Sequence, residues 1–516
     1  MQGEFRGDFT RDTHSPQKQF LRVLMQQGRV QLDADFNEQV SILLHYLQTL
    51  ATDLIGPYGG PAVGGGFEIA LSPGSSDQVE DLSISTGRYY VEGLLCENSS
   101  DDASFENQPY LPVDNNFDYP NLPFLVYLDI WERHIDAIQD ANPDGSIREI
   151  ALGGPDTATR SQVTWQVKLT QTLNVPNEAV QGEGDQTPLQ KILEFGTTPE
   201  SSASPSTNES GEPAGEPEED SLYSQVTQAA EVLRTNPEAL YQALPEIVAD
   251  AKLPKLKAKA KEISNSDDQK PCILSPNARY RGAENQLYRV EIHSGGDQPT
   301  FKWSRENSAV VFPITVASGS MLTLEHLGYD TRFGLQENDW VEIVENDPVY
   351  RNEPHKLLQV TNIDFVTQQV TLSSALEIDM DRDRPQQPYL RRWDHKESNP
   401  SYGGHKLASN GAIPVTLEGD SNQWQMLEDG IQVQFQQGVY RPGDYWLIPA
   451  RTATGDIEWP RESSGASLAI SPHGVRHYYA PLAIVVSNDG GTSEAVSCRK
   501  QFVPLPMLAQ NSALTP

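Results

Sequence analysis

The chain has 516 residues, of which 37% are hydrophobic, and its 72 acidic and 38 basic residues give a formal net charge of −34. This length predicts two to four domains, and the charge disfavours nucleic acid and anionic membrane surfaces as partners. The 38 glycines and 37 prolines are typical of many turns and short strands. We therefore expect a mainly β, multidomain protein.

Residues 1–60 predict a helical module at the start of the chain. Apolar residues recur at three- and four-residue intervals up to Ile55, namely Phe36, Val40, Leu43, Leu44, Leu47, Leu50, Ala51 and Leu54. Asp33 or Asp35 can cap this helix, and Gly56 with Pro57 ends it. A shorter helix over 16–26 and a strand-like run over 28–32 complete the expected N-terminal helical hairpin.

Two interpretations of this module remain open, a simple cap on the body or a docking element. The docking interpretation assigns partner contacts to apolar residues on both predicted helices and the link between them. These are Phe20, Leu24, Leu32, Phe36, Val40, Leu44 and Leu47.

Further β structure is predicted over 61–176 and 271–330, which we expect to form one β domain across an insertion. Residues 82–85 and 88–96 are β-prone runs on either side of a turn signal at Thr86-Gly87. Residues 123–131 are apolar on both faces, as in a central strand, and 162–169 alternate as in a half-buried strand. The strand that ends the first part and the one over 286–293 are expected to pair.

The insertion covers 177–270 and has two parts. Residues 197–221 have a composition that predicts disorder, whereas 222–263 predict a helical region that ends in a lysine cluster. That cluster either attracts an acidic partner or is a solvated helix face. Beyond it we expect a small SH3- or OB-like barrel over 331–390, a C-terminal β domain over 391–504 and a loose tail over 505–516.

The sequence offers little catalytic or metal-binding chemistry. Asp379, Asp381 and Asp383 alternate as calcium ligands do, but the required glycine and distal glutamate are missing, and local ion pairs are the alternative. The histidine pair His473 and His477 lacks zinc-helix spacing. No nucleophile elbow, phosphate loop or dinucleotide motif occurs. We therefore expect no enzyme activity, no metal and no cofactor.

The cysteines and the apolar runs indicate where the protein is made. Cys96, Cys272 and Cys498 show neither a metal-binding spacing nor a disulfide framework, so we expect reduced, buried thiols. The polar N-terminus predicts no signal peptide, and the lack of a run of about eighteen apolar residues predicts no transmembrane helix.

The tryptophans have two interpretations, core packing or a sugar-stacking platform. Most lie in alternating strands, whereas the segment 391–395 is polar on both sides of its tryptophan. The residues concerned are Trp303, Trp340, Trp393, Trp424, Trp446 and Trp459.

Several segments resemble known proteins. "QGRVQLDADFNEQ" is similar to the openings of phage tail-fibre and baseplate-attachment proteins, and "GRYYVEGLLCE" resembles hairpins common in tail fibres. "EIALGGPDTATRSQVTWQVK", "YRGAENQLYRVEIH" and "FKWSREN" resemble a bacterial family of β-rich proteins encoded with phage-tail-like contractile injection systems. The resemblance covers most of the chain apart from 176–270 and the tail.

This resemblance implies a non-catalytic structural component of such a particle, at the baseplate periphery or as a tail-fibre base. It implies docking through the N-terminal helices to baseplate or fibre proteins, and a homo-oligomer, by analogy a trimer. It also implies cytoplasmic synthesis followed by assembly into the particle. The alternative function is a carbohydrate-binding or carbohydrate-active surface protein.

Overall fold

The computed structural model describes residues 3–71, 79, 81–112, 119–140, 147–152, 157–169, 222–235, 253–261, 279–328, 330, 332–351, 353–376, 388–398, 404–417, 424–487 and 492–503. The chain divides into two compact units, each built from three separate segments. Unit 1 comprises Met1–Leu44, Glu132–Gln162 and Ala251–Arg476, and unit 2 comprises His45–Trp131, Val163–Asp250 and His477–Pro516.

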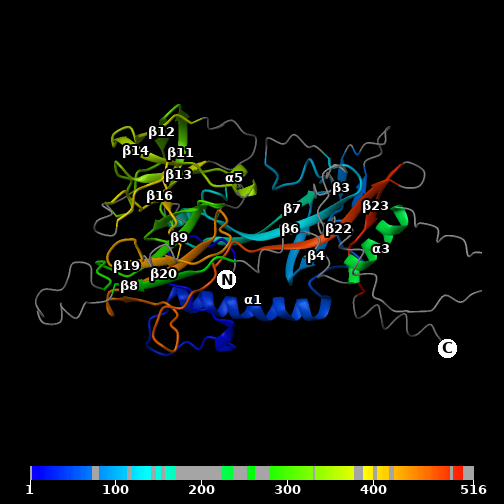
Figure 1. Ribbon diagram of the computed structural model, residues 1–516, viewed down its shortest axis with the longest axis horizontal. Helices are drawn as coiled ribbons and strands as arrows, with labels where there is room; N and C mark the ends of the chain where they lie inside the picture. Colours follow the sequence, from blue (N-terminus) through cyan, green and yellow to red (C-terminus); the bar gives the residue numbers. More distant parts are fainter. Residues whose placement is uncertain are drawn as a thin grey trace, which may run out of the picture. The chain divides into compact units, whose positions relative to one another are not determined.

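The described elements are mostly strands (Figure 1). The helices are η1 (Pro16–Lys18), α1 (Asp33–Ile55), η2 (Ile150–Leu152), α3 (Leu222–Thr235) and α5 (Asn346–Arg351). The first strands are β1 (Tyr58–Pro61), β2 (Ile69–Leu71), β3 (Leu82–Ile84), β4 (Gly87–Val91), β5 (Leu94–Asn98), β6 (Phe124–Ile135), β7 (Arg160–Leu169) and β8 (Leu256–Ala260). The next are β9 (Gln286–Ser294), β10 (Thr300–Ser304), β11 (Val311–Ser318), β12 (Met321–Leu324), β13 (Trp340–Val344), β14 (Leu357–Asp364), β15 (Gln369–Leu372) and β16 (Tyr389–Trp393). The last are β17 (Ile413–Pro414), β18 (Gln425–Met426), β19 (Ile431–Phe435), β20 (Tyr445–Arg451), β21 (Asp456–Ile457), β22 (His477–Ser487), β23 (Ser493–Ser497) and β24 (Gln501–Phe502).

The long predicted helix is present as α1 and ends where its sequence predicts. The N–H of Gly56 donates to the carbonyl oxygen of Thr52 at 2.8 Å. Gly56 itself has a φ of +96°, a conformation that glycine adopts without steric cost. The apolar period and the terminal glycine were therefore sufficient to predict this helix.

The shorter helix expected over 16–26 is absent, so the predicted helical hairpin is wrong. A single 3₁₀ turn, η1, covers Pro16–Lys18 and ends at Gln19, whose φ is +55°, and residues 20–32 have no regular secondary structure. An isolated helix of about ten residues is marginal without a surface to pack on. The apolar side chains of this segment are exposed, so they provide no such packing.

Unit 1 contains a closed barrel with the strand order β11-β12-β15-β14-β13-β16, drawn in green and yellow in Figure 1. The expected barrel began at residue 331, but β11 and β12 also belong to it. Gly319, with a φ of +62°, makes the turn between these two strands. The barrel interior holds its own apolar cluster, which includes Ile314, Val341 and Val360.

The other sheets of unit 1 correct two predictions. β9 pairs with β10 and β20 and β7 lies next to β6, so the expected pairing between the strands of 162–169 and 286–293 is wrong. The helical prediction over 222–263 is right for α3, but residues 256–260 form the strand β8, paired with β19. Leu256, Ala258 and Ala260 are buried along β8 and alternate with lysines, which is the strand period of two.

Unit 2 is built from two four-stranded sheets, ordered β24-β1-β4-β5 and β23-β22-β6-β7, with the pair β2-β3. β6 lies between β22 and β7, which confirms the central strand predicted there. The first hairpin turns at Glu92 and Gly93, between β4 and β5, and not at Thr86-Gly87. α3 contributes buried residues such as Val226 and Leu233 to the core of this unit.

The remaining domain predictions meet the structure only in part. The C-terminal domain expected over 391–504 is divided, since β17–β21 belong to unit 1 and β22–β24 to unit 2. The disorder predicted over 197–221, the loose tail 505–516, Cys272 and the three aspartates Asp379, Asp381 and Asp383 lie outside the described residues. Cys96 and Cys498 are free and buried, as expected.

Candidate docking surface and ionic networks

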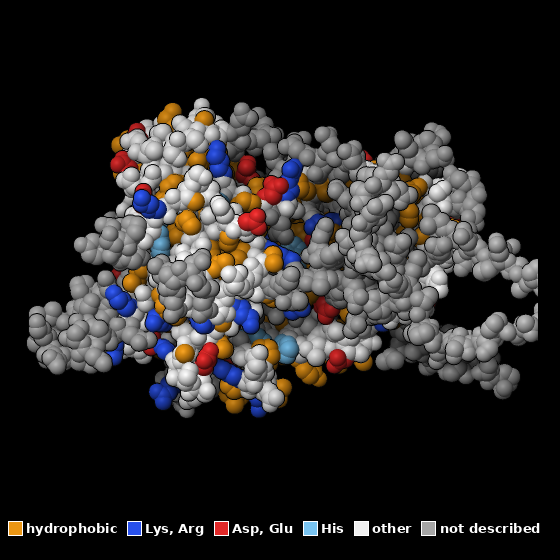
Figure 2. Space-filling model, viewed as in Figure 1, with side chains coloured by type: hydrophobic (Ala, Val, Ile, Leu, Met, Phe, Trp, Pro, Cys, Tyr) orange, Lys and Arg blue, Asp and Glu red, His pale blue; other side chains and the backbone are white. Residues whose placement is uncertain are grey.

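Residues 20–54 expose most of the large apolar side chains that reach solvent in the described part of the chain. The seven residues predicted to contact a partner are all exposed, between 40% and 69% of each: Phe20, Leu24, Leu32, Phe36, Val40, Leu44 and Leu47. Leu21, Met25, Val30, Leu43, Tyr46, Leu50 and Leu54 extend the set. We call these fourteen residues the N-terminal apolar surface; Figure 2 shows orange side chains along the lower edge of the view, where Figure 1 draws α1 and the N-terminal segment.

The two sides of α1 have opposite character. The residues that α1 buries are Ala34, Ser41 and Ile42, of which two are small. Phe36, on the other side, is 67% exposed. A surface helix ordinarily turns its apolar stripe toward the core, so α1 presents the stripe that a partner would cover.

Polar contacts hold the segment before α1 beside that helix. The Thr10 N–H donates to Asp33 at 2.8 Å, and the Thr13 hydroxyl donates to Glu38 at 2.7 Å. The N–H of Val23 donates to the side-chain oxygen of Gln39 at 2.9 Å. Backbone and side-chain hydrogen bonds to α1 therefore position the segment, while its apolar side chains stay free of the core.

The first described residues do not belong to this surface. The Tyr445 hydroxyl donates to the Gly3 carbonyl oxygen at 2.8 Å, and Arg289 donates to that of Phe5 at 2.9 Å. The predicted module 1–60 is thus divided, because its first residues are part of the interior of unit 1.

A buried ionic network lies in unit 1 and joins the N-terminal residues to the sheet and the barrel. Glu291 on β9 pairs with Arg6 at 2.9 Å, with Arg289 at 2.6 Å and with Lys302 at 3.3 Å. Lys302 on β10 also pairs with Glu342 on β13. The other members are Arg391 on β16, 2.9 Å from Glu342, and Glu4, 2.5 Å from Arg6.

Every carboxylate in the network faces cations, and their charges set its protonation. Burial alone raises the pKa of Glu342, yet Lys302 and Arg391 hold that pKa well below its ordinary value. Burial also raises the pKa of Glu291, but the charges of Arg6, Arg289 and Lys302 outweigh burial and hold that pKa well below its ordinary value. Both carboxylates are therefore ionised in the folded protein, and losing one partner would leave an unpaired buried charge.

Aromatic rings complete the surroundings of the cations. The Arg289 guanidinium lies 3.6 Å from the centre of the Tyr445 ring, and the Lys302 ammonium lies 4.3 Å from that of Trp393. Cations over aromatic faces gain electrostatic stabilisation. Trp393, within the polar segment 391–395, is fully buried, so this ring is no sugar-stacking platform.

Of the other tryptophans, three are also buried: Trp303, Trp446 and Trp459. Trp340 is stacked on His395, and the Lys259 ammonium lies over Trp424 at 4.6 Å. The core-packing interpretation therefore fits the four buried rings.

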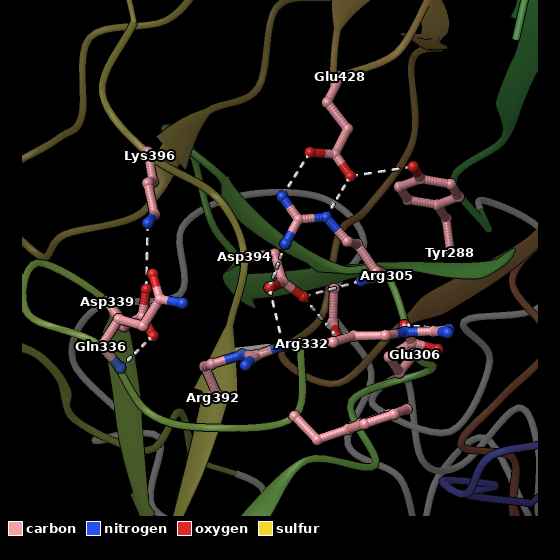
Figure 3. Close-up of polar contacts among 12 residues, drawn as sticks. Tyr288, Arg305, Glu306, Arg332, Gln336, Asp339, Arg392, Asp394, Lys396 and Glu428 are labelled. Carbon is pink, nitrogen blue, oxygen red and sulfur yellow. Dashed lines mark hydrogen bonds and ion pairs between the residues drawn. The ribbon is translucent and has the colours of Figure 1, made fainter. Parts of the chain in front are cut away.

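A second network lies in unit 1 around the partly exposed Arg305 (Figure 3). Arg305 binds both carboxylate oxygens of Glu428, at 2.6 and 2.7 Å, and binds Asp394 at 3.0 Å. Tyr288 donates to Glu428 at 2.9 Å, and Arg392 lies 3.3 Å from Asp394. Burial lowers the pKa of Arg305, but the hydrogen bonds to Glu428 and the charge of Asp394 raise it overall.

Two further ion pairs appear in the same view. Arg332 pairs with Glu306 at 2.8 Å, and Lys396 pairs with Asp339 at 3.1 Å. A bidentate arginine–carboxylate pair fixes orientation as well as distance. The second network therefore braces the segment after β16 against β10 and the turn before β19.

Five histidines in unit 1, three buried and two half-buried, are held neutral. Burial lowers the pKa to about 3 at His134 and His293 and to about 4 at His355, His395 and His473.

His477, in unit 2, lies 2.7 Å from Asp129, which also binds Lys168 at 2.6 Å. Among the described residues no group of histidine, cysteine and acidic side chains could hold a metal ion.

Sequence reasoning missed the buried network, although a signal for it was present. Glu291 stands between Val290 and Ile292, and Lys302 between Phe301 and Trp303. A charged residue inside an otherwise apolar strand predicts a buried, paired charge, because an unpaired one is too costly. The segments that carry the family resemblance, "YRVEIH" and "FKWSREN", supply these residues.

None of the described helices combines the length and apolar character that crossing a bilayer requires. No curated protein and no solved structure matches the chain. The chain does match a protein family described as a family of unknown function (DUF6519), over residues 5–514. Because this match covers nearly the whole chain, the protein belongs to the DUF6519 family.

Proposed function

We propose that this protein is a non-catalytic structural component of a contractile, phage-tail-like injection particle. It sits at the baseplate periphery or at the base of a tail fibre, and it docks through its N-terminal apolar surface. The proposal joins two kinds of support, the tail-protein resemblance of residues 27–39 and the exposure of the apolar residues around them.

The observation that carries the proposal is the N-terminal apolar surface itself. Contiguous exposed apolar patches on a water-soluble surface mark interaction sites. Here the patch belongs to a chain with a net charge of −34, whose remaining surface favours water. An apolar groove on a baseplate or fibre protein would cover this patch.

The ionic networks support a structural role for the body of unit 1. They connect the N-terminal residues, the sheet and the barrel through buried pairs such as Lys302 with Glu342. Such pairs are a means of fixing one arrangement of packed elements. A rigid body with a separate apolar docking segment suits a part that transmits force within a particle.

The test is affinity purification of the tagged full-length chain from its native cells, with mass spectrometry of the proteins that accompany it. We expect sheath, tube and baseplate proteins with the natural sequence. The double variant Leu21→Gln with Leu24→Gln should no longer co-purify with these particle proteins. It should still fold, because the two side chains are 77% and 69% exposed and contribute nothing to the core.

The matched control is Phe365→Gln with Val366→Gln. These residues are at least comparably exposed, at 71% and 92%, but lie outside the N-terminal apolar surface. The control should retain all particle proteins. Recovery of the natural chain alone would overturn the proposal, and equal loss in both double variants would overturn the docking assignment.

A further inference from the structure

α1 carries an exposed heptad pattern. Six of the eight large apolar residues that it exposes follow one another at intervals of four, three, four, three and four positions, in the order Phe36, Val40, Leu43, Leu47, Leu50 and Leu54. We call these six residues the α1 seam. Each is between 40% and 75% exposed.

We propose that the α1 seam packs against the same seam of further copies of this chain, as a short coiled coil. Alternating three- and four-residue spacing averages 3.5 residues, which keeps apolar side chains on one side of a helix over successive turns. Side chains at that spacing fit as knobs into the holes of an identical helix. The pattern is therefore complementary to itself.

The other side of α1 is already occupied. Ala34, Ser41 and Ile42 are buried, whereas the six seam residues are exposed. The helix is also folded before it meets a partner. Association then avoids the ordering cost that makes short isolated coiled coils marginal.

The residues beside the seam allow a copy of this chain to be the partner. Partner choice in coiled coils is set largely by charged residues at the flanking positions. Here these positions are Gln39, Tyr46 and Asp53 on one flank and Asn37, Leu44 and Ala51 on the other. Only Asp53 is charged, so no ionic pattern selects a foreign partner.

The seam is long enough for a stable interface. Nineteen helical residues extend about 28 Å. Two seams that meet, with Leu44 and Tyr46 beside them, remove on the order of 1,000 Å² from water, which is the lower end for a specific interface.

This inference rests on the proposed docking function in taking the exposed side of α1 as an interface. It assigns that side to copies of the chain and leaves the apolar residues of 20–32 for other particle proteins. Self-association is measured on the purified chain without the particle, so the two proposals fail separately.

The experiment is light scattering behind size-exclusion chromatography on the full-length chain, over a dilution series and at two salt concentrations. We expect a mass of two or more chains. Added salt should strengthen the association, because it screens repulsion between acidic bodies while the α1 seam itself is uncharged. The double variant Leu43→Gln with Leu47→Gln should be a monomer under the same conditions.

Thr49→Gln is the matched control, since Thr49 is exposed on α1 but lies outside the seam. It should keep the mass of the natural chain, and circular dichroism should show that all three proteins are folded. If the double variant unfolds, Phe36→Ser at the end of the seam replaces it. A monomeric natural chain, or an oligomer that folded seam variants leave intact, would overturn the inference. An intact oligomer that brings down no particle proteins would overturn the proposed function alone.

Discussion

Gly93 contacts Gln48 backbone to backbone: a Cβ atom at Gly93 would lie 2.2 Å from the Gln48 carbonyl oxygen. Gly93 is the second residue of the β4–β5 turn and has a φ of +76°, after a φ of +48° at Glu92. Two successive positive φ values are the requirement of the tight hairpin turn that best matches strand twist. This turn therefore packs directly against the backbone of the second half of α1, within unit 2.

Gly93→Ala should therefore destabilise the protein by roughly 2–4 kcal/mol, since it combines positive-φ strain with a clash against backbone. The measurement is urea unfolding followed by circular dichroism. Gly64→Ala is the control in the same unit: Gly64 has the same φ of +76°, and the nearest atom to its Cβ is a flexible arginine tip at 3.8 Å. It should cost about 1 kcal/mol. Equal losses in the two variants would show that the Gln48 contact adds nothing.

Glu342→Gln should destabilise unit 1 strongly. Glu342 is fully buried between Lys302 and Arg391, and removing one member of a buried ionic group costs about 3–5 kcal/mol. Glu325→Gln is the comparison, because the Glu325 carboxylate lies 3.7 Å from Arg148 at exposed positions. That pair is worth less than about 1 kcal/mol. Similar unfolding midpoints for the two variants would contradict the importance of the buried network.

Stability should fall as pH is lowered from about 7 to 4. The five buried or half-buried histidines of unit 1 take up a proton near pH 6.5 in the unfolded chain, but only at about 3 or 4 when folded. Below pH 6.5 the unfolded state therefore binds more protons and is favoured. Burial raises the pKa of Asp444 to about 7 and raises those of Glu306 and Glu428 above their ordinary values. These three carboxyls act in the opposite direction, but they are fewer than the five histidines.

The measurement is the urea midpoint at several pH values across this window. His395→Gln should flatten the dependence, because His395 is fully buried and remains neutral when folded. A midpoint that does not change between neutral pH and pH 5 would show that these histidines are solvated.

Arg305→Lys should cost about 1–2 kcal/mol, even though the charge is kept. Lysine cannot reproduce the two parallel hydrogen bonds to Glu428 or reach Asp394 at the same time. Arg461→Lys is the control, since Arg461 pairs with Asp456 at 2.9 Å with both side chains largely exposed. It should change stability by less than about 0.5 kcal/mol. A result in the reverse order would contradict the bracing role of the second network.

The sequence predicted elements whose information is local. The period of α1, the two apolar faces of β6 and the barrel strands β13 to β15 needed only neighbouring residues. The strand β8 was missed because its lysines suggested a solvated helix, although Leu256, Ala258 and Ala260 alternate with a period of two. The pairing of β9 with β20 and the partners of Glu291 depend on residues far apart in the chain, and local periodicity contains no such information.

The discontinuous units have a consequence for biosynthesis. Gly60 in β1 pairs with Gln501 in β24, and Leu287 in β9 pairs with Pro449 in β20. Loops of this length close slowly, and β9 keeps an open edge until the ribosome has made β20. Unit 1 cannot be completed before β20 has been made, nor unit 2 before β24. We therefore expect nascent chains to depend on chaperones that bind unfolded segments. Premature termination should yield aggregation-prone, protease-sensitive fragments.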